Sequence, residues 1–105
     1  MSQFQKAIAD ATKAIQLNPK DAGAYYSRAS AYGVIGNSRQ SIQDFTMAIT
    51  LAPTCGAYIG RGYEYGKSGN SSKAIEDFKM AVQLDPNNDA ASNFLQEALD
   101  GTITY

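Results

Sequence analysis

The sequence predicts an all-α protein of about six helices, and a phrase that recurs along the chain is the main reason. The three copies are KAIADATKAIQLNP at 6–19, QSIQDFTMAITLAP at 40–53 and KAIEDFKMAVQLDP at 73–86. Each copy carries apolar residues at helical spacing and ends at a proline, which disfavours helical angles in the residue before it. The spacing is also regular, with 34 residues from Pro19 to Pro53 and 33 from Pro53 to Pro86. Such a period is typical of repeat architectures.

The first complete repeat is expected over residues 22–53, as two helices joined by a short turn. The first helix presents one apolar face at helical spacing: Tyr25, Ala29, Tyr32 and Ile35. In the turn Gly36-Asn37-Ser38, Gly or Asn can take the left-handed residue that ends a helix, and Ser can cap the next one. The second helix presents another apolar face before Pro53 stops it: Ile42, Phe45, Ala48 and Ile49.

The second complete repeat, over residues 55–86, has the same design. Its matching residues each follow 33 positions later: Tyr58, Gly62, Tyr65, Gly69, Phe78 and Ala81. One residue is therefore missing just after Pro53. A turn between helices tolerates such a deletion best.

Residues 1–19 read as the second helix of a partial repeat, since the recurring phrase is a second helix in both complete repeats. Ala11 stands where Phe45 and Phe78 stand later, and a large aromatic at that place would need neighbours that this start does not supply. Two explanations remain open. The chain is a segment of a longer array, or it is a complete short protein with a degenerate first cap.

Residues 88–100 are expected to form a C-terminal capping helix. Asn88 or Asp89 can cap its start and Gly101 can end it. Its outer side is polar, as a terminal helix of a repeat array requires for solubility. Residues 101–105 are expected to form a loose tail.

In these repeats the chain resembles the tetratricopeptide repeat family, whose helix–turn–helix units have a period of 34 residues. The matching positions are Tyr25, Ala29, Tyr32, Phe45, Ala48 and Pro53, then Tyr58, Gly62, Tyr65, Ala74, Phe78, Ala81 and Pro86. Ser41 departs from the usual Ala. The resemblance implies one domain over residues 1–105, a helical solenoid in which antiparallel helix pairs stack as a right-handed superhelix. The small residues let paired helices approach closely, and the aromatics fill the wider gaps.

Composition argues against several classes of function. The chain has 9 basic and 10 acidic residues, a net charge of −1 and no basic stripe, so a nucleic-acid partner is not expected. Its apolar runs are too short for a membrane span, and its start lacks the features of a signal peptide. Cys55 stands alone, so an internal disulfide is excluded. Together these features favour a cytoplasmic protein.

The sequence offers little for catalysis. It has no histidine, the commonest general base and metal ligand, and Cys55 has no candidate partner. Glu76 and Asp77 are adjacent on a helix, point in different directions and are expected to be solvated. The Gly-Lys-Ser at residues 66–68 has Arg61 where a phosphate-binding loop needs its first Gly, so it is interpreted as a helix end. A non-enzyme without cofactor or metal is expected.

The resemblance implies that the first helix of each pair lines a concave groove for a partner's peptide or helix. The candidate groove residues are Tyr26, Ser30, Val34, Ile59, Tyr63 and Lys67. Some family members hold a partner's terminal carboxylate with a clamp of Lys, Asn and Arg. Only Lys67 is cationic among these positions, so docking of heat-shock chaperone tails is not supported. Gly33, Gly60 and Gly66 are expected to leave room for a partner's backbone.

The sequence therefore predicts a scaffold or adaptor that binds a protein or peptide partner. Two alternatives remain. The chain could self-associate through unfinished repeat ends, because Phe4, Ile8 and Ile15 belong to a helix without its pair and would expose an apolar edge. It could also be a regulatory segment of a larger multidomain protein, such as an enzyme whose catalytic domain lies elsewhere.

Overall fold

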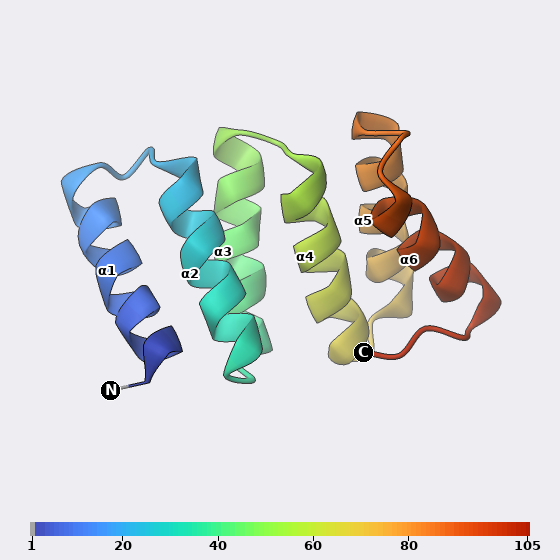
Figure 1. Ribbon diagram of the computed structural model, residues 1–105, viewed down its shortest axis with the longest axis horizontal. Helices are drawn as coiled ribbons and strands as arrows, with labels where there is room; N and C mark the ends of the chain where they lie inside the picture. The colour runs from blue at the N-terminus through green and yellow to red at the C-terminus, as the bar shows by residue number, and fades with distance from the viewer. Residues whose placement is uncertain (1) are drawn as a thin grey trace. The chain divides into compact units, whose positions relative to one another are not determined.

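The computed structural model describes residues 2–105, and these residues form six α-helices and no β-strand (Figure 1). The helices are α1 (Gln3–Leu17), α2 (Ala22–Val34), α3 (Ser38–Leu51), α4 (Cys55–Lys67), α5 (Ser71–Leu84) and α6 (Asp89–Asp100). The all-α prediction with about six helices is confirmed.

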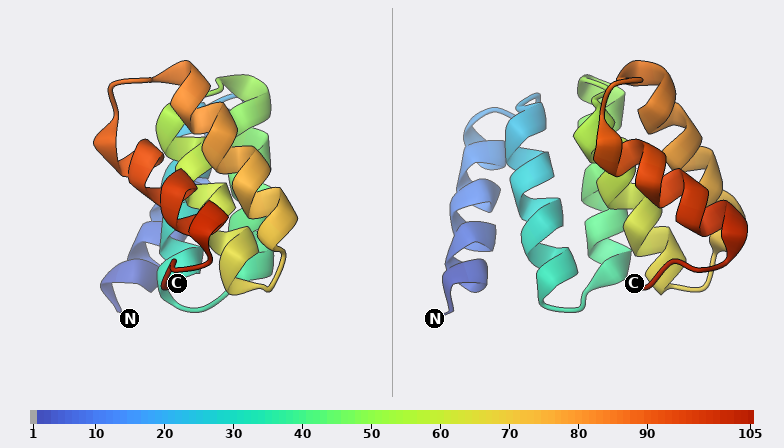
Figure 2. Two further views of the ribbon diagram at one scale, coloured as in Figure 1. Left: turned by 90° about the vertical axis from the view of Figure 1, so that its right-hand side faces the viewer. Right: turned by 45° about the vertical axis from the view of Figure 1, so that its right-hand side comes forward.

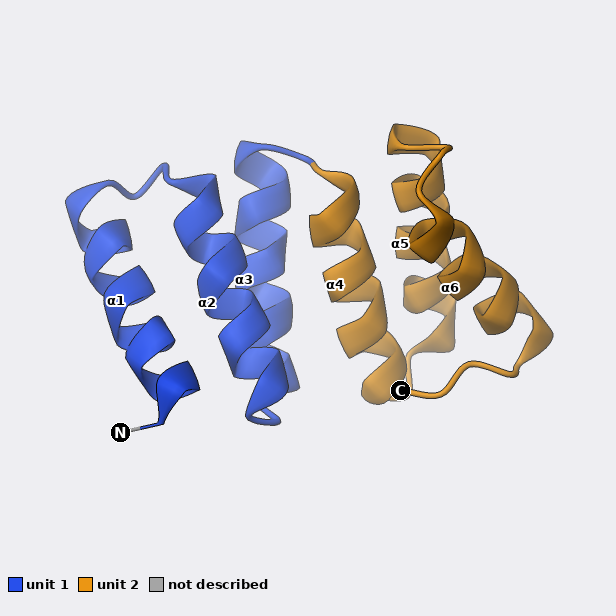
Figure 3. Cartoon of the chain, in the orientation of Figure 1, with its two compact units in different colours: residues 1–53 blue, residues 54–105 orange. Residues whose placement is uncertain are grey.

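The helices belong to two compact units, residues 1–53 and residues 54–105 (Figure 3). In the N-terminal unit, α2 packs against both α1 and α3. In the C-terminal unit, α4 packs against α5, and α6 packs mainly on α5 while also touching α4. Each unit thus contains one complete helix pair and one additional helix. That the whole chain is one domain stays a prediction.

The turns between paired helices follow the predicted break with one change. Gly36 has a φ of +87°, a left-handed conformation that glycine adopts without strain. The cap of α3 is Asn37, whose side chain accepts a hydrogen bond from the backbone amide of Gln40, while Ser38 is already the first helical residue. The turn at residues 69–71 repeats this arrangement in the C-terminal unit. The prediction that serine caps these helices is therefore wrong.

A close approach of helices organises the core of the C-terminal unit. Phe78 is 0% exposed and its ring stacks on that of Phe94, with centroids 5.4 Å apart. A methyl group on Gly62 would lie 2.8 Å from the Phe78 ring, closer than side chains approach. The prediction that small residues let the paired helices approach is confirmed at this position.

The departure at Ser41 has a simple physical account in the N-terminal unit. Ser41 is fully buried, and its hydroxyl donates a hydrogen bond of 2.7 Å to the backbone carbonyl of Ala29. A buried hydroxyl is tolerated when it has a partner. Serine here therefore replaces the usual alanine and ties α3 to α2.

Each helix pair also contains an ion pair between its two helices. The guanidinium of Arg28 donates to both carboxylate oxygens of Asp44, at 2.7 and 2.9 Å. Arg61 donates to Asp77 in the same way, at 2.9 and 2.8 Å. The hydrogen bond to the aspartate raises the pKa of each arginine. Asp77 is 4% exposed, so the expectation that this aspartate is solvated is wrong, although Glu76 is exposed.

The chain turns back after α6. Asn88 caps the start of this helix and Gly101 ends it with a left-handed φ of +74°, as predicted. The amide of Thr102 then donates to the carbonyl of Glu97 at 3.0 Å, the bond that closes a Schellman turn. In Figures 1 and 2 the end of the chain lies beside the last turn of α4. The expectation of a loose tail is wrong, because the ring of Tyr105 packs against α4.

Candidate functional site

Three of the candidate residues share one side of α2 and are called the α2 face: Tyr26, Ser30 and Val34. They are four positions apart, so they lie one above another on the helix. Tyr26 is 40% exposed and Val34 is 61% exposed. The hydroxyl of Ser30 donates to the backbone carbonyl of Tyr26 at 3.1 Å, so this face offers mostly apolar surface to a partner.

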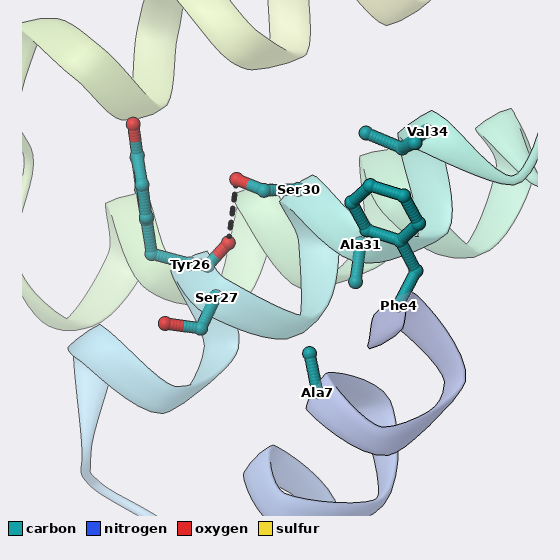
Figure 4. Close-up of a pocket in the computed structure, with 7 residues that line it drawn as sticks. All are labelled: Phe4, Ala7, Tyr26, Ser27, Ser30, Ala31 and Val34. Carbon is teal, nitrogen blue, oxygen red and sulfur yellow. Dashed lines mark hydrogen bonds between the residues drawn. The ribbon is translucent and has the colours of Figure 1, made fainter. Parts of the chain in front are cut away.

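A hollow of about 310 Å³ opens beside the α2 face, between α1 and α2 (Figure 4). Its lining is mostly apolar: Phe4, Ala7, Tyr26, Ser27, Ser30, Ala31 and Val34. Figure 4 shows the Phe4 ring beside Ala31 and Val34, with Tyr26 at the opposite end. Phe4 is 41% exposed. Phe4 and Ala7 are not among the groove residues that the sequence predicts, although Phe4 is expected on the exposed edge of its helix.

The ring of Tyr26 packs against a buried ring of α3. It makes an edge contact with the ring of Phe45, with centroids 5.6 Å apart and planes at 78°. This is a preferred arrangement for aromatic pairs. Tyr26 therefore combines a fixed orientation with a large exposed surface, which suits an interface residue.

The other three candidates lie along α4 and are called the α4 face: Ile59, Tyr63 and Lys67. Ile59 and Tyr63 are half-buried, and the Tyr63 ring makes an edge contact of 6.0 Å with that of Phe94. The amine of Lys67 lies 3.4 Å from a carboxylate oxygen of Glu64 and 5.7 Å from the centroid of the Tyr63 ring. Part of the lysine's charge is therefore already compensated within the helix.

Tyr105 covers part of the α4 face. Its ring centroid is 5.3 Å from that of Tyr63, and a methyl group added to Gly66 would overlap the Tyr105 ring. Burial, and secondarily Tyr63, raises the pKa of the Tyr105 phenol. Gly66 was expected to leave room for a partner's backbone, but the chain's own tyrosine takes that room. Gly33 is buried, so the same expectation is wrong there.

Cys55 and the Gly-Lys-Ser at residues 66–68 lie at the two ends of α4. Cys55 is half-buried at the start of α4, and its pKa is raised by burial and by the charge of Asp85. The Gly-Lys-Ser at residues 66–68 lies at the end of α4, as predicted. Within residues 2–105, no three His, Cys, Asp or Glu side chains gather as a metal would require. None of the described helices is long and apolar enough to cross a membrane.

Comparison with known proteins identifies the class. Two models of the tetratricopeptide repeat match residues 11–43 and residues 56–88. The fold is similar to the Arabidopsis OM64 TPR domain, with 30% identity, a TM-score of 0.90, and coverage of 94% of this chain and 83% of that chain. The chain belongs to the tetratricopeptide repeat family, and the predicted all-α tetratricopeptide-repeat solenoid class is confirmed.

Two further similar structures hold peptides. The first TPR of Spaghetti (RPAP3), bound to the HSP90 peptide SRMEEVD, is 26% identical with a TM-score of 0.90, covering 94% of this chain and 79% of that one. The second TPR domain of human RPAP3, in complex with the HSP70 peptide SGPTIEEVD, is 28% identical with a TM-score of 0.87, covering 92% and 82%. These two domains, which share the fold of this chain, bind peptides.

A curated relative contains a shorter similar stretch. Serine/threonine-protein phosphatase T of Trypanosoma brucei brucei is 40% identical over 47 residues. The match spans 45% of this chain and 10% of the phosphatase. The similarity thus concerns a small part of that protein.

Proposed function

We propose that this chain is a protein-interaction module that binds a partner's peptide segment, with the α2 face and the α4 face as its candidate binding surfaces. The observation that carries the proposal is the open apolar hollow beside α2, flanked by the exposed side chains of Phe4, Tyr26 and Val34. Exposed apolar surface gathered around a concavity is typical of interaction sites. The peptide-bound structures of RPAP3 domains with the same fold support this function.

The chemistry of these faces favours an apolar or aromatic segment over an acidic one. The peptides bound to the RPAP3 domains both end in Glu-Glu-Val-Asp. Recognition of several carboxylates depends on charge-assisted hydrogen bonds from Lys or Arg. The two faces contain one cation, Lys67, and its amine already pairs with Glu64. The main anchor of the partner is therefore an apolar side chain in the hollow, and raising the salt concentration weakens binding only slightly.

Selection of peptides on the purified chain, followed by calorimetry with variants, tests this function. Val34→Asp places a charge on the α2 face, and Tyr26→Ala removes its aromatic surface. Each is expected to cost more than about 1 kcal/mol of binding free energy, as truncation of an interface anchor does. Gln43→Ala is the control, because Gln43 is an exposed residue of α3. The proposal fails if the control weakens binding as much as these variants, or if none of them has an effect.

Self-association is the function that would replace peptide binding if these tests fail. The helix α1 leaves Phe4 at 41% and Leu17 at 80% exposure, whereas Ile8 and Ile15 are half-buried. Light scattering across a concentration series separates the two functions. A dimer that Ile8→Lys dissociates would favour assembly, and a monomer at high concentration would remove it.

A second candidate, a regulatory segment of a larger enzyme, is favoured by the 47-residue similarity to the phosphatase. In that case the same two faces would bind a segment of the larger protein or of its substrate. Sequencing the natural transcript on both sides of the region that encodes this chain tests the idea. A catalytic domain in the same reading frame would support it, and stop codons on both sides would exclude it.

A further inference from the structure

The segment after α6 ends with the ring of Tyr105 against α4, and side-chain exposure alternates along it. Ile103 and Tyr105 are half-buried, whereas Thr102 and Thr104 are exposed. This alternation is typical of an extended segment with one side on a protein surface. The left-handed Gly101 and the hydrogen bond from the Thr102 amide to Glu97 direct the chain into this position. The segment thus places one aromatic side chain on α4, as a bound peptide could.

The place that Tyr105 occupies is made by two residues of α4. The absence of a side chain at Gly66 lets the tyrosine ring lie directly on the helix backbone, since a single methyl group there would overlap the ring. Tyr63 adds an edge contact between rings, at 5.3 Å and 67°. We call this place the tyrosine seat. Its two walls, a glycine and an aromatic ring, leave room for a flat aromatic side chain.

We infer that residues 103–105 are an intramolecular occupant of the α4 face, and that a partner segment inserts its own aromatic side chain into the tyrosine seat by displacing Tyr105. This inference rests on the proposed function, because Tyr63 belongs to a face proposed to bind peptides. The occupant also indicates the preferred partner: an extended segment that presents an aromatic side chain, as Tyr105 does.

The tail can compete with a partner for the tyrosine seat, and a partner can still displace the tail. A short tether gives the tail an effective concentration in the millimolar range, so a contact with a dissociation constant of about 0.1 mM occupies the seat in about nine molecules out of ten. Tyr105 is only half-buried, so no deep core has to open when it leaves. Apparent affinity falls in proportion to the fraction of molecules with an open seat. A tail that occupies the seat in nine molecules out of ten would weaken partner binding about tenfold.

The occupancy of the seat is measured first, without any partner. NMR spectra of the wild-type chain are expected to show nuclear Overhauser contacts between the Tyr105 ring and the α-protons of Gly66. Thr104→Ala, a change on the exposed side of the same tail, keeps contacts between the ring and residue 66. Gly66→Ala removes them, because the methyl group takes the place of the ring. Absence of these contacts in the wild type would overturn the inference.

Competition is then measured with a synthetic peptide, Gly-Thr-Ile-Thr-Tyr, which copies residues 101–105. By NMR titration, Tyr105→Ala is expected to bind this peptide at least about fivefold more tightly than the wild type, with Thr104→Ala matching the wild type. Adding Gly66→Ala to Tyr105→Ala abolishes binding. Equal affinity of the wild type and Tyr105→Ala, or no binding to Tyr105→Ala, would overturn the inference. Neither result touches the proposed function, which depends on the separate effects of Tyr26→Ala and Val34→Asp on a selected peptide.

Discussion

Replacing Phe78 by alanine removes the central side chain of the C-terminal unit. The ring is fully buried, stacks on Phe94 at 5.4 Å and fills the space that Gly62 leaves open. Truncation of a buried phenylalanine costs about 3–5 kcal/mol, which includes about 0.5–1.5 kcal/mol from the aromatic pair. A unit of roughly 50 residues has a total stability of about 3–8 kcal/mol. The substitution therefore removes between about a third and all of the stability of this unit.

Urea unfolding followed by far-ultraviolet circular dichroism measures the loss. Met80→Ala is the matched control, because Met80 lies on the same helix two positions further on and is 37% exposed. Its effect is expected to stay within about 0.5 kcal/mol, as for most surface substitutions. A cost below about 1 kcal/mol for Phe78→Ala, or a cost equal to that of Met80→Ala, would refute this assignment of the core.

Three other substitutions test separate parts of the C-terminal unit. Gly62→Ala forces a methyl group against the Phe78 ring and should lower the free energy of unfolding by about 1–3 kcal/mol in urea titrations, whereas better helix propensity alone would raise it. Asp77→Ala leaves the guanidinium of Arg61 without its main partner and should cost about 3 kcal/mol by thermal or urea unfolding, more than Glu76→Ala on the exposed side. Because the pKa of Tyr105 is raised in the folded chain, its contribution to stability is present below about pH 10 and is lost as pH rises through the folded-state value. Unfolding midpoints measured from about pH 9 to about pH 11 should therefore fall less in Tyr105→Phe than in the wild type, and equal slopes would contradict this.

The helix pairs were predictable because their signals are local and repeated. Apolar spacing, a left-handed glycine and a proline after each second helix recur at a fixed period, and the structure follows them. The core position of Phe78 and the close approach at Gly62 follow from the same register.

The two ion pairs between helices could have been predicted from the sequence, although they are not among the predictions made from it. Arg28 and Arg61 stand at equivalent places in the two repeats, and Asp44 and Asp77 recur at the same interval. Two opposite charges that recur together in a helix pair indicate contact across the pair. The bond from Ser41 to the backbone of Ala29 was less accessible, because it depends on the depth of the hydroxyl between two helices.

The candidate site was only partly predictable. Helical spacing places Tyr26, Ser30 and Val34 on one side of α2, and the structure has them there. The contribution of Phe4 depends on how α1 packs against α2, which spacing within one helix does not determine. The seat of Tyr105 depends on the direction in which the chain leaves α6, and residues 101–105 carry no periodic signal. These two parts of the site therefore depend on tertiary packing, which the sequence pattern does not reveal.

The most direct test of the central claim is an NMR map of peptide binding. The isotopically labelled chain is titrated with a peptide selected on it, and amide shift changes are followed residue by residue. The account predicts the largest changes at Phe4, Tyr26 and Val34, around the hollow beside α2. Changes concentrated instead on the exposed side of α3, at residues such as Gln43, would contradict the claim that this protein binds its partner through the α2 face.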